Sequence, residues 1–259
     1  MKTAFLHLLQ DTRNFLFPKT CPVCRRRLLR EEGEVCMICQ CHLTRLPYRS
    51  TDCHPTLEQK FYWNRKFVRG TCHFYFTDNM RTLVHQFKYR HNGAMAFQLG
   101  KTAADEMKDS GFFNDIDCII PVPLHWKRQL IRGYNQSEKI AQGIRSVTHT
   151  PVRTDALKRA VNNATQTHLR KDERERNVAD IFEISPTAVF PPHSHVLILD
   201  DVLTTGATLN ACMEAMSRIP DIRISIFALC YASDTPVGEI DFDESFDYEF
   251  VMDDPPKPA

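Results

Sequence analysis

The sequence predicts an α/β protein with a mainly parallel sheet flanked by helices, preceded by a small cysteine-rich module. From Cys72 onward, short apolar runs alternate with helical patterns of ten or more residues, which is typical of βαβ units. Before that point the chain carries two Cys-x-x-Cys pairs and few strand-like runs. We therefore expect an N-terminal helix and cysteine module over residues 1–70, an α/β domain over 71–250 and a disordered tail over 251–259.

The individual elements are predicted from local apolar patterns. Val196–Asp200 is a continuous apolar run ending in aspartate, and Cys118–Val122 is a similar short run. Such runs are typical of buried parallel strands. The other expected strands cover residues 72–76, 157–161 and 223–232, and the expected helices cover residues 80–89, 94–108, 134–146 and 208–218.

Composition and charge are those of a soluble globular protein, with 42% apolar and 25% charged residues. The formal net charge of +1 gives no overall field that would favour nucleic acid or a membrane. No apolar run approaches the roughly 18–20 residues that cross a bilayer. Apolar residues at helical spacing over residues 5–16 predict an amphipathic helix packed on the protein, with membrane-surface binding as the alternative. We expect a cytoplasmic protein with no membrane span.

Two cysteine pairs near the N-terminus have the character of zinc knuckles. Cys21-Pro-Val-Cys24 and Cys36-Met-Ile-Cys39 would each place two thiolates on one turn, and two such turns close a tetrahedral site. Because no export signal is evident, metal is favoured over disulfides. We expect structural Zn²⁺ held by Cys21, Cys24, Cys36 and Cys39. The spacing leaves open a part in metal binding for Cys41, His42, Cys53 and Cys72.

A strand followed by a turn rich in threonine and glycine occupies residues 196–208. Ligands of open α/β sheets bind at the carboxyl ends of the strands. Gly206 permits a tight turn at a helix N-terminus, where backbone N–H groups bind anions. The turn lacks the lysine of a triphosphate P-loop, which favours a monophosphate. We expect the phosphate to be held by Thr204, Thr205, Gly206, Ala207 and Thr208.

Two carboxylates, Asp200 and Asp201, stand directly before that turn. They would repel an anion, but they suit a ligand that also carries a diol, because ionised aspartate accepts hydrogen bonds from two ribose hydroxyls. A phosphate with an adjacent ribose is the expected ligand. The alternative is structural: Asp201 caps a turn and the threonines begin a helix.

Residues 196–208 resemble the phosphoribosyl-diphosphate signature of type I phosphoribosyltransferases. Other blocks resemble the ComF family, which is linked with bacterial competence and the use of external DNA. These blocks are Phe87-Lys-Tyr89, Ile120-Pro-Val-Pro-Leu124, Arg132-Gly-Tyr-Asn-Gln136, and Thr165-Gln166 with Arg174 and Asn177. The resemblance covers most of residues 18–232. The chain departs from it at Arg25, where the family commonly has glycine, and in lacking a second set of cysteine pairs.

The resemblance implies a type I phosphoribosyltransferase-like fold and a phosphoribosyl diphosphate ligand bound with Mg²⁺. The loop after residue 124 would bind the diphosphate, with Arg128 and Arg132 as cationic contacts and Asn135 as a neutral one. Diphosphate gains negative charge as it leaves, so cations at this place would stabilise the transition state. We expect Arg132 to act catalytically. Surface exposure of the two arginines is the alternative.

The charged stretch over residues 159–177 is poor in apolar side chains. It is either an exposed loop or a lid that closes over the sugar diphosphate. In the second case we expect Arg174 to act catalytically, together with Arg132. A nucleic-acid contact is a third interpretation, weakened by the acidic residues at 172, 173 and 175.

The expected function is transfer of a phosphoribosyl group to an unidentified nitrogen acceptor. The alternative is a non-catalytic module that senses a phosphoribosyl ligand, while the zinc segment contacts DNA, or a protein of DNA uptake or recombination. In type I enzymes a variable hood recognises the acceptor, and residues 40–70 are its candidates by position.

Overall fold

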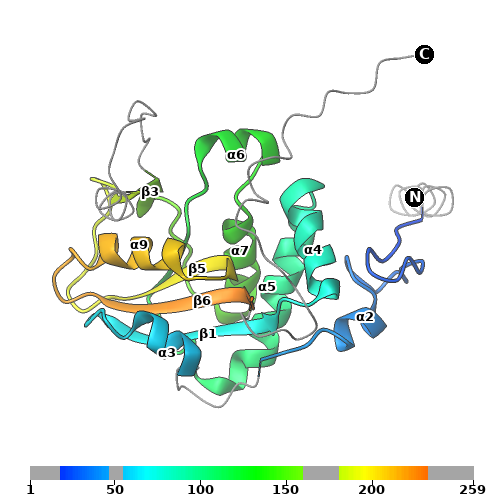
Figure 1. Ribbon diagram of the computed structural model, residues 1–259, viewed down its shortest axis with the longest axis horizontal. Helices are drawn as coiled ribbons and strands as arrows, with labels where there is room; N and C mark the ends of the chain where they lie inside the picture. The colour runs from blue at the N-terminus through cyan, green and yellow to red at the C-terminus, as the bar shows by residue number, and fades with distance from the viewer. Residues whose placement is uncertain (1–17, 47–54, 160–180, 233–259) are drawn as a thin grey trace, which may run out of the picture.

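The computed structural model describes residues 18–46, 55–159 and 181–232. Its centre is a four-stranded parallel sheet in the order β1-β6-β5-β2 (Figure 1). The strands are β1 (Phe67–Tyr75), β6 (Arg223–Tyr231), β5 (His195–Leu203) and β2 (Cys118–Pro121). Because β5 lies between β6 and β2, its carboxyl end is flanked by the ends of other strands, where ligands of such sheets bind.

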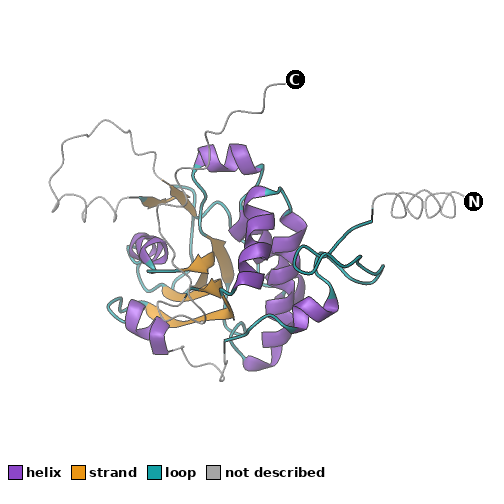
Figure 2. Ribbon diagram, turned by 45° about the vertical axis from the view of Figure 1, so that its right-hand side comes forward, coloured by secondary structure: helices purple, strands orange, loops and turns teal. Residues whose placement is uncertain are grey.

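Side chains of the central strands alternate between two buried clusters. Leu197 and Leu199 of β5 face the first cluster, and Val196 and Ile198 face the second. The first is covered by α4 (Asp78–Tyr89), α5 (Gly93–Met107) and α7 (Gln136–Thr148), and the second by α3 (Pro55–Phe61) and α9 (Ala207–Met216). Figure 2 shows the sheet between these two groups of helices. Burial on both faces explains why the strands are continuous apolar runs.

Helices α5 and α7 approach each other closely through two glycines. A Cβ atom at Gly100 would overlap the backbone of Ile140, and one at Gly143 would overlap the backbone of Phe97. The close approach fixes the start of α7 relative to the first face of the sheet, and this start carries residues of the site described below.

The expected fold class is confirmed, with differences in shorter elements. The expected strand at 157–161 is β3 (Leu157–Arg159), which pairs antiparallel with β4 (Phe182–Ile184) outside the parallel sheet. Three short helices were not predicted: α2 (Met37–Cys41), α3 and α6 (Trp126–Arg132). A 3₁₀ turn at Lys108–Ser110 follows α5.

The cysteine segment packs on the α/β unit. Cys36, Val35 and Leu43 belong to the first buried cluster, together with residues of α5. Gln40 Nε2 donates to Thr102 Oγ1 at 3.2 Å, and Arg45 forms an ion pair with Glu106 at 2.7 Å. The sheet itself begins at Phe67, so part of the segment assigned to residues 1–70 lies within the α/β unit.

Several predicted segments lie outside the described residues: the N-terminal helix, the charged stretch over 159–177 apart from Arg159, and the tail. Among the helices that the structure describes, none has the length and apolar character needed to cross a membrane.

Candidate functional site

The predicted loop follows the central strand β5, as expected. The strand extends to Leu203, so Asp200 and Asp201 lie within its last residues rather than beyond its end. Thr204 and Thr205 form the turn, and Ala207 and Thr208 begin α9. The strand therefore holds both carboxylates rigidly beside the turn.

Gly206 is the residue on which the turn depends. It has φ 87°, in the left-handed region, and is the N-cap of α9. The N–H groups of the first helical turn have no partner within the helix, and the helix dipole is positive there. The Thr205 hydroxyl accepts from the Ala207 N–H at 3.3 Å. This geometry can bind an anion.

Asp200 is bound to two neighbouring elements. Its Oδ1 accepts from the Ser137 hydroxyl at 3.1 Å and from the Asp201 N–H at 2.8 Å. Ser137 lies in the first turn of α7, so this contact joins the predicted loop to the block that begins at Arg132.

Asp201 is 5% exposed, and its Oδ2 lies 3.4 Å from Lys88 Nζ of α4. The two atoms are within ion-pair distance, yet Oδ2 accepts no hydrogen bond in the described part of the chain. A buried carboxylate oxygen with spare acceptor capacity suits a ligand hydroxyl or a cation. Lys88 is part of the Phe87-Lys-Tyr89 block that resembles the ComF family, but the sequence did not indicate its ion pair with Asp201.

Burial and the neighbouring Asp201 carboxylate raise the pKa of Asp200 from 3.8 to about 7. The Asp201 N–H, the Lys88 ammonium and the Ser137 hydroxyl act in the opposite direction. Two carboxylates held this close disfavour full ionisation of the pair, so a cation or a hydroxyl-bearing ligand would stabilise the charged form.

The block at residues 132–136 lies against the ends of β2 and β5. Asn135 is the N-cap of α7: its Oδ1 accepts from the Ser137 N–H at 3.0 Å, and its Nδ2 donates to the Val122 carbonyl at 2.9 Å. The side chain thus ties α7 to the end of the neighbouring strand. Its direct contact with a ligand stays a prediction.

The two predicted arginines of this block differ in environment. Arg132 is 8% exposed, donates to Gln136 Oε1 at 3.0 Å and lies over the Tyr89 ring at 5.4 Å. Arg128 is half-buried on α6. The structure shows Arg132 engaged within the protein, and its contact with diphosphate remains untested. Arg174 lies outside the described residues.

The segment after residue 55, a candidate for acceptor recognition, lies against the predicted loop. A Cβ atom at Gly206 would sit 3.3 Å from the Phe61 ring. Trp63 Nε1 donates to Asn210 Oδ1 of α9 at 3.1 Å, and Trp63 is 49% exposed. This segment thus forms one wall beside the start of α9.

The four predicted zinc ligands form a cluster. The Sγ atoms of Cys21, Cys24, Cys36 and Cys39 all lie within 4.8 Å of one another. Cys24 and Cys36 are 3.7 Å apart, close to the sulfur–sulfur edge of about 3.8 Å in a tetrahedron with Zn–S bonds of about 2.3 Å. These cysteines could bind a zinc ion.

Electrostatics favours a thiolate at one member of this cluster, Cys36. Burial opposes ionisation of Cys36, but the Cys39 N–H and the Arg26 guanidinium lower its pKa to about 6. Among described residues, the cluster does not include Cys41, His42 or Cys72; Cys72 is buried in β1, and Cys53 lies outside the described chain.

A Ser-His-Asp arrangement lies at the opposite ends of the strands. His195 Nε2 is 2.8 Å from Ser225 Oγ, and its Nδ1 is 3.0 Å from Asp115 Oδ2. Ser225 is 0% exposed and His195 is 1% exposed, so no substrate reaches the hydroxyl. The arrangement satisfies buried polar groups where β5 and β6 begin.

Curated proteins of bacterial competence and DNA utilisation align with most of the chain. Competence protein F of Haemophilus influenzae is 25% identical over 225 residues, covering 82% of this chain and 96% of that protein. DNA utilization protein YhgH of Salmonella typhimurium is 26% identical, covering 82% and 97%. Competence protein ComFC of Bacillus subtilis is 24% identical, covering 74% and 75%. These proteins are homologues of the chain. The resemblance to the ComF family is thereby confirmed, although no protein-family model matches the sequence.

Among solved structures, a hypoxanthine phosphoribosyltransferase of Trypanosoma cruzi aligns with 59% of this chain and 72% of that protein's chain. The TM-score is 0.31 and the sequence identity is 17%.

Proposed function

We propose that the protein binds phosphoribosyl diphosphate with Mg²⁺ and transfers its phosphoribosyl group to a nitrogen acceptor. The observation that carries the proposal is the arrangement at the end of β5. The Asp200–Asp201 pair precedes a left-handed Gly206 at the start of α9, which places two carboxylates beside an anion-binding turn.

Each half of that arrangement fits one part of the ligand. The N–H groups of the turn and of the first helical turn would hold the 5′-phosphate, with the hydroxyls of Thr204, Thr205 and Thr208 as further donors. Asp200 and Asp201 would accept from the two ribose hydroxyls. The buried Asp201 Oδ2, which accepts no hydrogen bond among the described residues, supports this assignment.

The diphosphate would lie toward the α6–α7 segment, which the Ser137–Asp200 contact holds at the same end of the sheet. Arg128 and Arg132 would face its charge, together with Arg174 from the segment outside the described residues. Mg²⁺, bound with the ligand, would neutralise charge on the leaving diphosphate. The protein's part is positioning and charge stabilisation, because ribosyl transfer through an oxocarbenium-like state needs no protein nucleophile.

Cytoplasmic action in the handling of external DNA is part of the proposal, and the names of the homologues support it. Those names equally support a non-catalytic alternative. In it the strand-end site senses a phosphoribosyl ligand, and the zinc module contacts DNA or a protein partner. Structural zinc belongs to both versions.

Calorimetric titration of phosphoribosyl diphosphate with Mg²⁺ into the zinc-loaded full chain tests the ligand. We expect binding to the wild type and its loss in Asp200→Ala/Asp201→Ala. The matched control is Asp105→Ala/Asp109→Ala, which removes two exposed carboxylates elsewhere and should bind as the wild type does. Absence of binding to folded wild type would overturn both versions.

Turnover separates the two versions. With binding established, purine, pyrimidine and amine acceptors are screened for release of diphosphate. Release that depends on an acceptor and is lost in the Asp200→Ala/Asp201→Ala variant supports the transferase. Tight binding without release for any acceptor supports the sensing module.

A further inference from the structure

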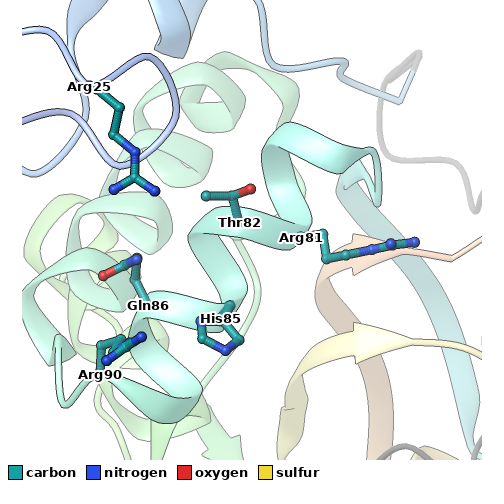
Figure 3. A pocket seen from close by; sticks show the side chains of 6 residues that line it. All are labelled: Arg25, Arg81, Thr82, His85, Gln86 and Arg90. Atoms are coloured by element: carbon teal, nitrogen blue, oxygen red, sulfur yellow. The ribbon is translucent and has the colours of Figure 1, made fainter.

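A cavity of about 540 Å³ lies between the cysteine module and α4. Its lining consists of Arg25, Arg81, Thr82, His85, Gln86 and Arg90. Figure 3 shows Arg25 extending from the loop after Cys24 toward α4, which supplies Thr82, His85 and Gln86. The volume is within the usual range of small-molecule sites.

The lining is cationic. Three of its six residues are arginines and none is acidic. Arg81 lies 3.9 Å from the exposed Asp78 one turn earlier in α4, whereas Arg25 and Arg90 form no ion pair with any described residue. The guanidinium groups of Arg25 and Arg90 are exposed, so an anion bound there would gain charge-assisted hydrogen bonds without displacing an ion pair of the described chain.

Arg25 has a left-handed backbone conformation, which is unusual for a residue other than glycine. Arg25 has φ 64°, and its N–H donates to the Cys21 carbonyl at 2.8 Å to close the knuckle. Left-handed backbone costs a non-glycine residue about 1 kcal/mol, so glycine would suit this turn better. Arg25 thus presents its guanidinium to the cavity from a backbone conformation that glycine would adopt at lower cost.

The chemistry of the lining identifies the ligand class. Arginine pairs bind phosphate oxygens in bidentate fashion, and the Gln86 amide offers a neutral donor. The His85 and Tyr89 rings, 5.0 Å apart, place an aromatic surface next to the charges. The enclosing residues come from one knuckle and about three turns of one helix, which suits a compact ligand better than an extended strand of nucleic acid.

We propose that this cavity is a second ligand site, which binds a small anion carrying two or more phosphate charges. Arg25 and Arg90 are its main charge contacts. Because one wall is the zinc knuckle and the other is the helix that carries Lys88, ligand bound here would bridge the cysteine module and the α/β unit. The site is independent of phosphoribosyl diphosphate binding at the end of β5.

Pyrophosphate is the probe, titrated into the zinc-loaded full chain carrying Asp200→Ala/Asp201→Ala, with zinc content measured afterwards. In this background we expect Arg25→Gly and Arg90→Gln each to weaken binding by roughly tenfold or more. Arg65→Gln, which removes an exposed arginine before β1, should leave the affinity unchanged. Because glycine suits the backbone at position 25, Arg25→Gly should keep or raise the melting temperature.

Equal pyrophosphate affinity in the parent, Arg25→Gly and Arg90→Gln proteins would overturn the proposal. So would a single-stranded oligonucleotide that binds more than tenfold tighter than pyrophosphate and loses that binding on Arg25→Gly, because the cavity would then serve a polymer. Phosphoribosyl diphosphate titrated into Arg25→Gly alone should keep the binding that Asp200→Ala/Asp201→Ala removes. Loss of ligand binding at the end of β5 can therefore be distinguished from loss of binding at the cavity.

Discussion

Lys88 Nζ lies 3.4 Å from Asp201 Oδ2 and connects α4 to the end of β5. Both side chains are largely shielded, with 19% and 7% exposed. The ammonium is the cationic side chain whose charge holds down the raised pKa of the adjoining Asp200. An ion pair at this depth matters chiefly through the charge that is left when one partner is removed.

Lys88→Met should destabilise the protein by about 1–3 kcal/mol at pH 8, because Asp201 would remain buried without compensating charge. The loss should shrink as the pH falls below the pKa of Asp200, since protonation removes charge from the pair. Denaturant unfolding at pH 8 and pH 5 measures it. An equal loss at both pH values would show that the lysine acts through Asp201 or through its aliphatic stem, and not through the charge of Asp200.

Asp200→Asn should have the opposite effect on stability. The folded pKa of about 7 lies above the ordinary 3.8, so the wild type loses stability as the pH rises from about 4 to 7. Asparagine keeps the acceptor for Ser137 and removes the titrating charge. We expect the variant to gain about 1–3 kcal/mol relative to wild type at pH 8 and little at pH 4.

The same substitution should weaken phosphoribosyl diphosphate binding, because an amide is a poorer acceptor for a ribose hydroxyl than a carboxylate. A variant that gains stability and loses affinity would show that the buried charge of Asp200 costs stability and serves ligand binding. A stable variant with undiminished affinity would contradict the role proposed for this carboxylate.

Gly206 and Gly133 provide a matched pair for testing the turn. Both have positive φ, 87° and 75°, but a Cβ at Gly206 would meet Phe61 at 3.3 Å, whereas nothing lies within 4 Å at Gly133. Gly133→Ala should cost about 1 kcal/mol from the backbone alone, and Gly206→Ala somewhat more. Thermal unfolding compares their stabilities, and Gly206→Ala should impair ligand binding more strongly than Gly133→Ala. Comparable impairment by both would locate the effect in general destabilisation.

The sequence was most informative where local pattern and chemistry coincide. The run from Val196 to Thr208 predicts strand, turn and helix because burial on both sheet faces demands apolar residues and the turn demands glycine. By contrast, α6 escaped prediction because it is short and its apolar residues Leu130 and Ile131 are exposed, at 75% and 58%. The antiparallel pairing of β3 with β4 joins distant segments, which no local pattern encodes.

Site residues that are adjacent along the chain could be predicted, whereas those brought together by packing could not. The carboxylate pair and the turn are adjacent along the chain and could be predicted, as could the four cysteines. The positions of Lys88, Ser137 and Phe61 depend on how three separate helices pack on the sheet. Their contacts with β5 and its loop are tertiary, so a motif scan could mark the block around Lys88 but not its partner.

Zinc removal should distinguish the four clustered cysteines from the exposed Cys41 nearby. We expect about one zinc per chain in wild type and in Cys41→Ser, and loss of the metal in Cys24→Ser, measured by elemental analysis of dialysed protein. Cys24 is the exposed member of the cluster, so its substitution leaves the buried packing of Cys21, Cys36 and Cys39 intact. Because these residues pack against α5, chelation should also lower the melting temperature of the whole chain.

Retention of zinc by Cys24→Ser with loss in Cys41→Ser would reassign the fourth ligand. Chelation without any effect on the melting temperature would mean that the module contributes nothing to the packed unit.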